Sequence, residues 1–133
     1  MKNLLIIFTL LFTSVFFSSP SYAEWTKLFT SENGSDFYVD FTTIRQTDRY
    51  VYYWELRNLI KPDKWGGLSS KTLYELDCNT PVKDRSVSTK YYTQTMGKGT
   101  PTLTDNTTRK WNYSPPQSGT EFITKQVCNA VGK

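Results

Sequence analysis

Two carboxylates have a spacing that could support acid–base chemistry, whereas the sequence contains no histidine. Glu75 and Asp77 lie two residues apart in an alternating segment, so a strand would place both on one face. Without imidazole, Ser-His-Asp catalysis, Cys-His catalysis and His-ligated zinc are excluded. Lys71 falls on the same face, and no neighbouring apolar pattern would raise a carboxylate pKa. We therefore interpret this face as solvated, expect no catalytic residue, cofactor or metal, and keep a carboxylate-dependent hydrolase as an alternative.

A single tryptophan stands out in the predicted loop from Lys61 to Leu68. Pro62 and the Gly66-Gly67 pair are typical of loop structure, and no strand pattern there requires burial of Trp65. Lys64 precedes it directly. Aromatic and basic side chains are common anchors of protein interfaces, so Lys64 and Trp65 are our candidate partner-binding residues. The alternative is a tryptophan that folds back over an open edge of the core.

Basic and aromatic residues also alternate at Lys90–Tyr92 and Arg109–Tyr113, a pattern that could stack bases and hold phosphates. The formal net charge of +4 is small for a nucleic-acid-binding domain, and basic runs are only two residues long. We interpret these aromatics as sheet residues and expect no nucleic-acid partner.

The N-terminus has the features of a signal peptide. Lys2 precedes an apolar run from Leu4 to Phe17, which is shorter than the roughly 20 residues of a membrane span. Small residues at Ser21 and Ala23 predict cleavage after Ala23, so residues 1–23 are assigned to the signal peptide and 24–133 to one domain. An uncleaved anchor is the alternative. No cysteine lies near this cut, so we expect a periplasmic or secreted protein without a lipid anchor or a remaining transmembrane span.

Cys78 and Cys128 are the only cysteines, and both lie in the predicted mature chain. Export carries them to an oxidising compartment, where pairing is the default and only one connectivity exists. The alternative, a free and reactive pair, lacks the close Cys-x-x-Cys spacing that it would need.

An alternation of period two predicts a β-rich chain. The expected strands are Trp25–Thr30, Phe37–Phe41, Tyr50–Ile60, Ser70–Cys78, Arg85–Met96 and Arg109–Tyr113, with a hairpin turn at Asn33-Gly34 and a polar loop over Gly97–Asn106. In the third strand, Tyr50, Tyr52, Trp54, Leu56 and Ile60 are expected to form the apolar face, opposite Glu55 and Arg57. Cys78 is expected to point inward with Tyr74 and Leu76.

A helix is expected at the C-terminus, because Ser118 and Glu121 fit a capping box. An apolar stripe of Ile123, Val127, Ala130 and Val131 should pack on the apolar face of the sheet. The predicted fold class is α+β: a single antiparallel sheet of about five to six strands, with a C-terminal helix packed on one face and tethered by the disulfide.

The ordered set of these signals resembles the bacterial surface-adhesin protein E family. The residues that carry it are Trp25, Phe37–Asp40, Ile44, Tyr74–Cys78, Tyr91–Tyr92, Met96–Gly97, Trp111, Pro115–Ser118 and Cys128. The resemblance implies an antiparallel sheet with a helix tethered by a Cys–Cys bond, and adhesion to host extracellular-matrix proteins.

Two functions follow from these expectations. The first is an exported, non-catalytic, adhesin-like binding protein that presents the loops Lys61–Leu68 and Gly97–Arg109 to a protein partner. The second is a soluble periplasmic accessory protein that binds an envelope component or inhibits a secreted enzyme. The sequence does not identify the partner, and it leaves the oligomeric state open.

Overall fold

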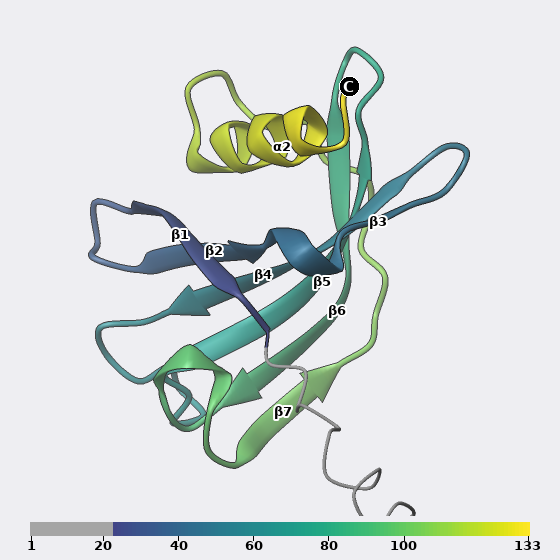
Figure 1. Ribbon diagram of the computed structural model, residues 1–133. Helices are drawn as coiled ribbons and strands as arrows, with labels where there is room; N and C mark the ends of the chain where they lie inside the picture. Colours follow the sequence, from purple (N-terminus) through teal and green to yellow (C-terminus); the bar gives the residue numbers. More distant parts are fainter. Residues whose placement is uncertain (1–22) are drawn as a thin grey trace, which may run out of the picture.

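The computed structural model describes residues 23–133, in which α2 lies across one face of an antiparallel sheet (Figure 1). The strands are β1 (Trp25–Thr30), β2 (Asp36–Asp40), β3 (Arg45–Gln46), β4 (Val51–Asn58), β5 (Ser69–Asp77), β6 (Lys83–Tyr92) and β7 (Pro101–Asp105). The helices are η1 (Phe41–Thr43), η2 (Thr95–Gly97) and α2 (Gly119–Ala130). The strand order is β1-β2-β4-β5-β6-β7, with β3 paired to β4. The predicted fold class is confirmed; the short β3 and the edge strand β7 bring the sheet to seven strands.

Residues 1–22, which hold all but the last residue of the predicted signal peptide, lie outside the described part of the chain. Within residues 23–133, no helix is long and apolar enough to cross a membrane.

The predicted hairpin joins β1 and β2. Gly34 has a φ of +84°, which glycine adopts without strain. A Cβ at that position would lie 1.9 Å from Cδ1 of Ile60, so glycine also leaves room for the Ile60 side chain. At the end of β2, the Asp40 carboxylate accepts hydrogen bonds from the backbone N–H and hydroxyl of Thr42, at 3.0 and 2.5 Å. These bonds cap η1 at the end of β2.

The faces of β4 differ from the prediction. The core lies on the face of Val51 and Tyr53, against α2, while Tyr52 and Trp54 point to the opposite face. The core residues are Val39, Val51, Tyr53, Leu76, Ile123, Val127 and Cys128. Glu55, on the same face as Val51 and Tyr53, therefore lies beneath the helix. Because aromatic side chains occur at both odd and even positions of this strand, alternation alone could not identify the covered face.

Two further predictions about the C-terminal half are wrong. Pro101–Asp105, expected to be a loop, forms the edge strand β7, where proline is tolerated because its missing N–H faces away from the ladder. Arg109–Tyr113, expected to be a strand, makes one isolated bridge between Asn112 and Asp84. β-branched residues in the first segment favour pairing, whereas Pro115 follows the second segment closely and limits its length.

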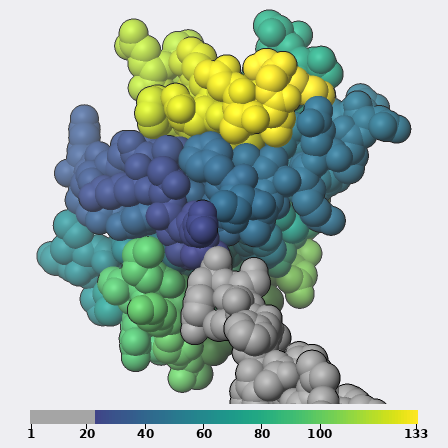
Figure 2. All heavy atoms as spheres, in the orientation of Figure 1, coloured from purple at the N-terminus to yellow at the C-terminus, as the bar shows by residue number. Residues whose placement is uncertain are grey.

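Helix α2 begins as predicted. The Ser118 hydroxyl accepts a hydrogen bond from the Glu121 N–H at 3.1 Å, and the Glu121 carboxylate accepts one from the Gln117 N–H at 3.3 Å. A Cβ on Gly119 would lie 2.3 Å from Cζ of Phe29, so glycine allows the first turn to approach β1 closely. In Figure 2 the atoms of α2 (yellow) rest directly on the first strands (purple to blue), in agreement with the edge-to-face contact between Phe29 and Phe122.

The other end of α2 is attached to β5. Cys78 and Cys128 form a disulfide with their Cα atoms 5.8 Å apart. Val127, one residue before Cys128, is fully buried in the core. The predicted tether between helix and sheet is confirmed.

Replacing the capping Ser118 with alanine is expected to lower the free energy of unfolding by about 1 kcal/mol, because the Glu121 N–H loses its hydrogen-bond acceptor. Urea unfolding would measure this change. Thr120→Ala, at an exposed position of the same turn, is the control. If both variants unfolded at the parent midpoint, the cap would not contribute to stability.

Candidate functional site

The loop between β4 and β5, residues 59–68, holds the predicted partner-binding residues and is here called the Trp65 loop. Its base is closed by backbone hydrogen bonds from Leu59 N–H to Leu68 C=O and from Leu68 N–H to Tyr92 C=O, each 2.8 Å long. The loop therefore connects β4 to β5, and its base is also hydrogen-bonded to the end of β6.

Asp63 organises the tip of this loop. Its carboxylate oxygen Oδ1 accepts hydrogen bonds from the N–H groups of Trp65 and Gly67, both at 2.8 Å. Its own N–H donates to Gly67 C=O at 2.8 Å, and its C=O accepts from Gly66 N–H at 3.0 Å. Four hydrogen bonds centred on one residue fix the backbone on both sides of Trp65, so the indole is presented from a preorganised turn.

The Trp65 side chain is 51% exposed. Nζ of Lys64 lies 4.2 Å from the centre of the indole ring, and the Tyr91 ring lies 6.2 Å away. Tyr91 supports one side of the indole while much of the ring faces solvent. The arrangement joins an aromatic surface to a cation, which suits recognition of a protein surface.

Ile60 is an exposed residue of this loop that the sequence analysis did not identify. We predicted it on the apolar face of a strand, but β4 ends at Asn58 and Ile60 is 65% exposed. Pro62 indicated in the sequence that the strand ends before it, because proline has no N–H group with which to continue the hydrogen-bond ladder. The Trp65 loop thus presents two large apolar side chains instead of one.

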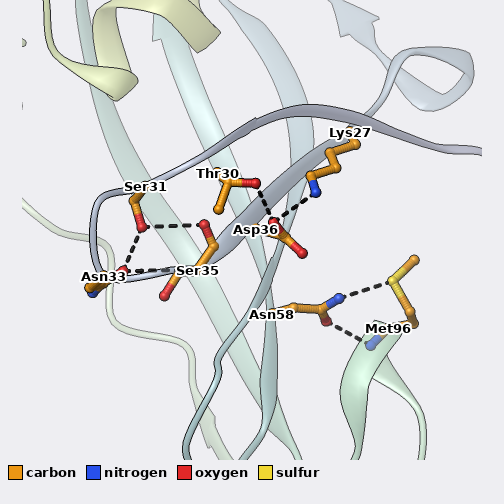
Figure 3. A network of polar contacts seen from close by, with 8 residues as sticks. All are labelled: Lys27, Thr30, Ser31, Asn33, Ser35, Asp36, Asn58 and Met96. Atoms are coloured by element: carbon orange, nitrogen blue, oxygen red, sulfur yellow. Dashed lines mark hydrogen bonds and ion pairs between the residues drawn. The ribbon is translucent and has the colours of Figure 1, made fainter.

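Neighbouring loops hold this end of the sheet in place (Figure 3). The Asn58 side chain accepts a hydrogen bond from Met96 N–H at 2.8 Å and contacts the Met96 sulfur at 3.2 Å, which attaches η2 to the end of β4. In the β1–β2 hairpin, the Ser31 hydroxyl donates to the Asn33 side chain at 2.5 Å. These contacts fix the loops on either side of the Trp65 loop.

An ion pair also holds the β1–β2 hairpin (Figure 3). The Asp36 carboxylate accepts a hydrogen bond from the Thr30 hydroxyl at 2.6 Å and contacts the Lys27 ammonium group at 2.9 Å. The Thr30 hydrogen bond, followed by the Lys27 contact, holds the pKa of Asp36 below its ordinary value.

The carboxylates considered for catalysis have structural partners. Glu75 accepts hydrogen bonds from the Tyr52 hydroxyl at 2.5 Å and from Arg85 Nε at 2.9 Å. Asp77 accepts one from the Asn79 N–H at 3.0 Å. Both residues are only 7% exposed, so the prediction of a solvated face is wrong. Strand pairing explains the burial, because β4 and β6 flank β5 and supply the long Tyr52 and Arg85 side chains.

Of the two basic and aromatic segments, Lys90–Tyr92 lies in β6, as we interpreted it, whereas Arg109–Tyr113 joins the sheet only through the isolated Asn112 bridge. Tyr91 supports Trp65, whereas Nζ of Lys71 lies 5.2 Å from the centre of the Tyr92 ring. Trp111 contacts Tyr50, with ring centres 5.3 Å apart, and lies beneath the Arg85 guanidinium group. These aromatics are distributed over different contacts instead of forming one stacking platform.

Solved structures of Haemophilus influenzae protein E share this fold. The structure of crystal form II of Haemophilus influenzae protein E matches with a TM-score of 0.65 and 18% sequence identity, covering 85% of this chain and 93% of that chain. Another structure of Haemophilus influenzae protein E matches with a TM-score of 0.63 and 17% identity, covering 84% and 89%. At these identities the likeness describes the fold alone.

No curated protein matches the sequence of this chain. The surface-adhesin protein E family does match, over residues 25–129, a range that runs from the start of β1 into the last turn of α2. The chain therefore belongs to the surface-adhesin protein E family.

Proposed function

We propose that this protein is an exported, non-catalytic, adhesin-like binding protein whose Trp65 loop contacts a protein partner such as a host extracellular-matrix protein. The observation that carries the proposal is the exposed Trp65 on a turn fixed by four Asp63 hydrogen bonds. An ordered loop loses little conformational entropy on binding, so its apolar surface contributes more fully to affinity. Membership of the surface-adhesin family supports the same function.

The chemistry of the loop suits a protein surface with apolar and acidic groups. Ile60 and Trp65 supply exposed apolar area, and Lys61 and Lys64 add positive charge beside them. Burial of an aromatic anchor next to a cation is typical of interface residues with large effects on binding. The charge should mainly speed association with an acidic partner.

Removing the indole is expected to weaken retention on immobilised extracellular-matrix proteins by roughly tenfold or more, because an interface anchor typically contributes about 2 kcal/mol. We would compare Trp65→Ala with the parent protein on a panel of purified matrix proteins by surface plasmon resonance. Tyr113→Ala is the matched control, since Tyr113 is a similarly exposed aromatic residue, at 57%, outside the loop.

A second comparison tests the preorganised turn. Asp63→Ala removes the carboxylate bonds but leaves Trp65 in place, so it should weaken retention by a smaller factor. Equal retention of the parent, Trp65→Ala and Tyr113→Ala would remove the Trp65 loop from the proposed function.

The proposed location is outside the cytoplasm, through cleavage of the signal peptide after Ala23. Fractionation of cells that express the full chain, followed by N-terminal sequencing, tests both parts of this proposal. Surface or secreted material beginning at Glu24 would support an adhesin. Strict retention in the periplasm would instead favour the accessory protein that binds an envelope component or inhibits a secreted enzyme.

A further inference from the structure

A polar cavity of about 520 Å³ lies between the first turns of α2 and the sheet, and Tyr91, whose ring also contacts Trp65, is part of its lining. We call it the helix–sheet cavity and define it by the lining residues Glu55, Arg57, Thr72, Tyr74, Thr89 and Thr120. Its volume is within the range of small-molecule sites. The cavity lies beside the hydrophobic core, yet its lining combines a carboxyl group and a guanidinium group with several hydroxyl groups.

Arg57 is a cation without an anion in this cavity. Its guanidinium carbon lies 5.4 Å from the centre of the Phe37 ring, and its Nε is buried without a hydrogen-bond partner. No carboxylate of residues 23–133 forms an ion pair with it. Partial burial of an unpaired guanidinium group is costly, and a bound carboxylate could accept two parallel hydrogen bonds from it. Arg57 therefore specifies an anionic group in the ligand.

Glu55 does not supply that anion near neutral pH. Burial raises its pKa to about 8, and the charge of Arg57 lowers the pKa only in part. The charge of Asp84, on β6, also raises the pKa of Glu55. The hydroxyl groups of Tyr53 and Tyr74 have raised pKa values and stay neutral, while Thr120 and Ile123 face the cavity from α2 without charge. The protonated carboxyl group of Glu55 can donate a hydrogen bond to a ligand.

Hydroxyl groups and aromatic rings form the rest of the lining. Ser70, Thr72, Ser86 and Thr89 line the cavity from β5 and β6. The Thr72 and Thr89 hydroxyl groups are hydrogen-bonded to each other at 3.1 Å, so this pair keeps one hydroxyl hydrogen for a ligand, while all four oxygens can accept hydrogen bonds. Phe29 and Phe37 form an apolar wall, with their rings stacked at a centroid distance of 4.7 Å. This combination matches a polyhydroxylated ring, which has hydroxyl groups at its rim and an apolar C–H face.

From these contacts we propose that the helix–sheet cavity binds a sugar acid of monosaccharide size, such as a uronic acid, with its carboxylate on Arg57. A singly charged carboxylate balances the one guanidinium group, whereas a phosphate dianion would leave a negative charge beside Glu55. The hydroxyl lining holds the sugar ring, and the Phe29–Phe37 wall packs against its apolar face. The proposal does not depend on the Trp65 loop binding a protein.

Calorimetric titration of the disulfide-intact protein with glucuronic acid at pH 7 tests this assignment. Glucose lacks the carboxylate and acetate lacks the ring, so both should bind at least about tenfold more weakly than glucuronate. We expect a dissociation constant of about 1 mM for glucuronate. The absence of any binding heat with about 10 mM glucuronate would therefore overturn the proposal. Equal affinity for glucose or for acetate would overturn the assigned ligand class.

Matched variants locate the binding. Arg57→Gln should lower the affinity for glucuronate by about tenfold or more. Arg45→Gln, which removes another arginine stacked on an aromatic ring at 5.4 Å, is the control and should retain the parent affinity. NMR chemical-shift changes of the parent protein on addition of glucuronate would locate the binding site without any substitution. Changes confined to residues outside the cavity would contradict the proposed site.

The pH dependence of glucuronate affinity tests the role of Glu55, because a purely structural role would leave this dependence unchanged. Affinity for glucuronate should fall between pH 7 and pH 9, because ionised Glu55 repels the ligand carboxylate. Glu55→Gln keeps a hydrogen-bond donor and should bind equally at both pH values. An equal loss of affinity in this variant would overturn the role of Glu55.

Discussion

Replacing Cys78 and Cys128 together with serine is expected to lower the free energy of unfolding by about 4 kcal/mol. The bond joins residues 50 positions apart, so in the chain-entropy model it removes much of the conformational freedom of the unfolded chain. It also attaches α2 to β5, and α2 contributes Ile123 and Val127 to the core. A domain of this size is typically stable by about 5–15 kcal/mol, so the expected loss is a large fraction of the total.

Urea unfolding of the double variant at pH 7 would measure this change. Ala130→Ser is the control, because it introduces the same side chain at an exposed position of α2. The parent protein under reducing conditions should unfold near the midpoint of the double variant, which separates loss of the bond from effects of the serines. A double variant as stable as the oxidised parent would show that packing alone holds α2 on the sheet.

Glu55→Gln is expected to stabilise the protein at alkaline pH and to have much less effect near pH 5. Glu55 has a pKa of about 8 in the folded protein, against an ordinary value near 4.5. Between these values the folded state binds more protons than the unfolded state, so stability falls as pH rises through about 8. A difference of about 3.5 pH units corresponds to roughly 5 kcal/mol at most, and water access through the cavity reduces this to about 2–3 kcal/mol.

Unfolding of the parent and of Glu55→Gln in urea at pH 5, 7 and 9 would reveal this effect as a gap that widens with pH. Glu32→Gln, in the exposed β1–β2 loop, is the control for removing one carboxyl group. Asp84 also has a pKa raised by burial, so the variant should keep part of the parent's pH dependence. A gap of constant size from pH 5 to pH 9 would show that Glu55 does not titrate in this range.

Local signals predicted much of the fold. The Asn33-Gly34 turn and the Ser118 cap each depend on a few consecutive residues, and both are present. The inward face of β5 was predicted correctly because Tyr74, Leu76 and Cys78 alternate with charged residues. Such signals are readable because the interacting groups are close in sequence.

The candidate sites were less predictable. Trp65 could be identified because the surrounding proline and glycines marked a loop, but the Asp63 hydrogen bonds that order it were not evident. Ile60 was assigned to a strand, since alternation does not show where a ladder ends. The burial of Glu75 was missed because its partners, Tyr52 and Arg85, come from different strands and meet only through sheet register.

By itself, the sequence determined the alternating strands, the start of the terminal helix and the pairing of its two cysteines, because these depend on local patterning or on having only one possible partner. Only the tertiary structure decided which face of β4 packs against α2. Both faces of that strand carry aromatic side chains, so the choice depends on where the 12-residue helix α2 packs on the sheet. That docking places Glu55 and Arg57 beneath the helix, and long-range packing of this kind leaves no periodic signal in the strand itself.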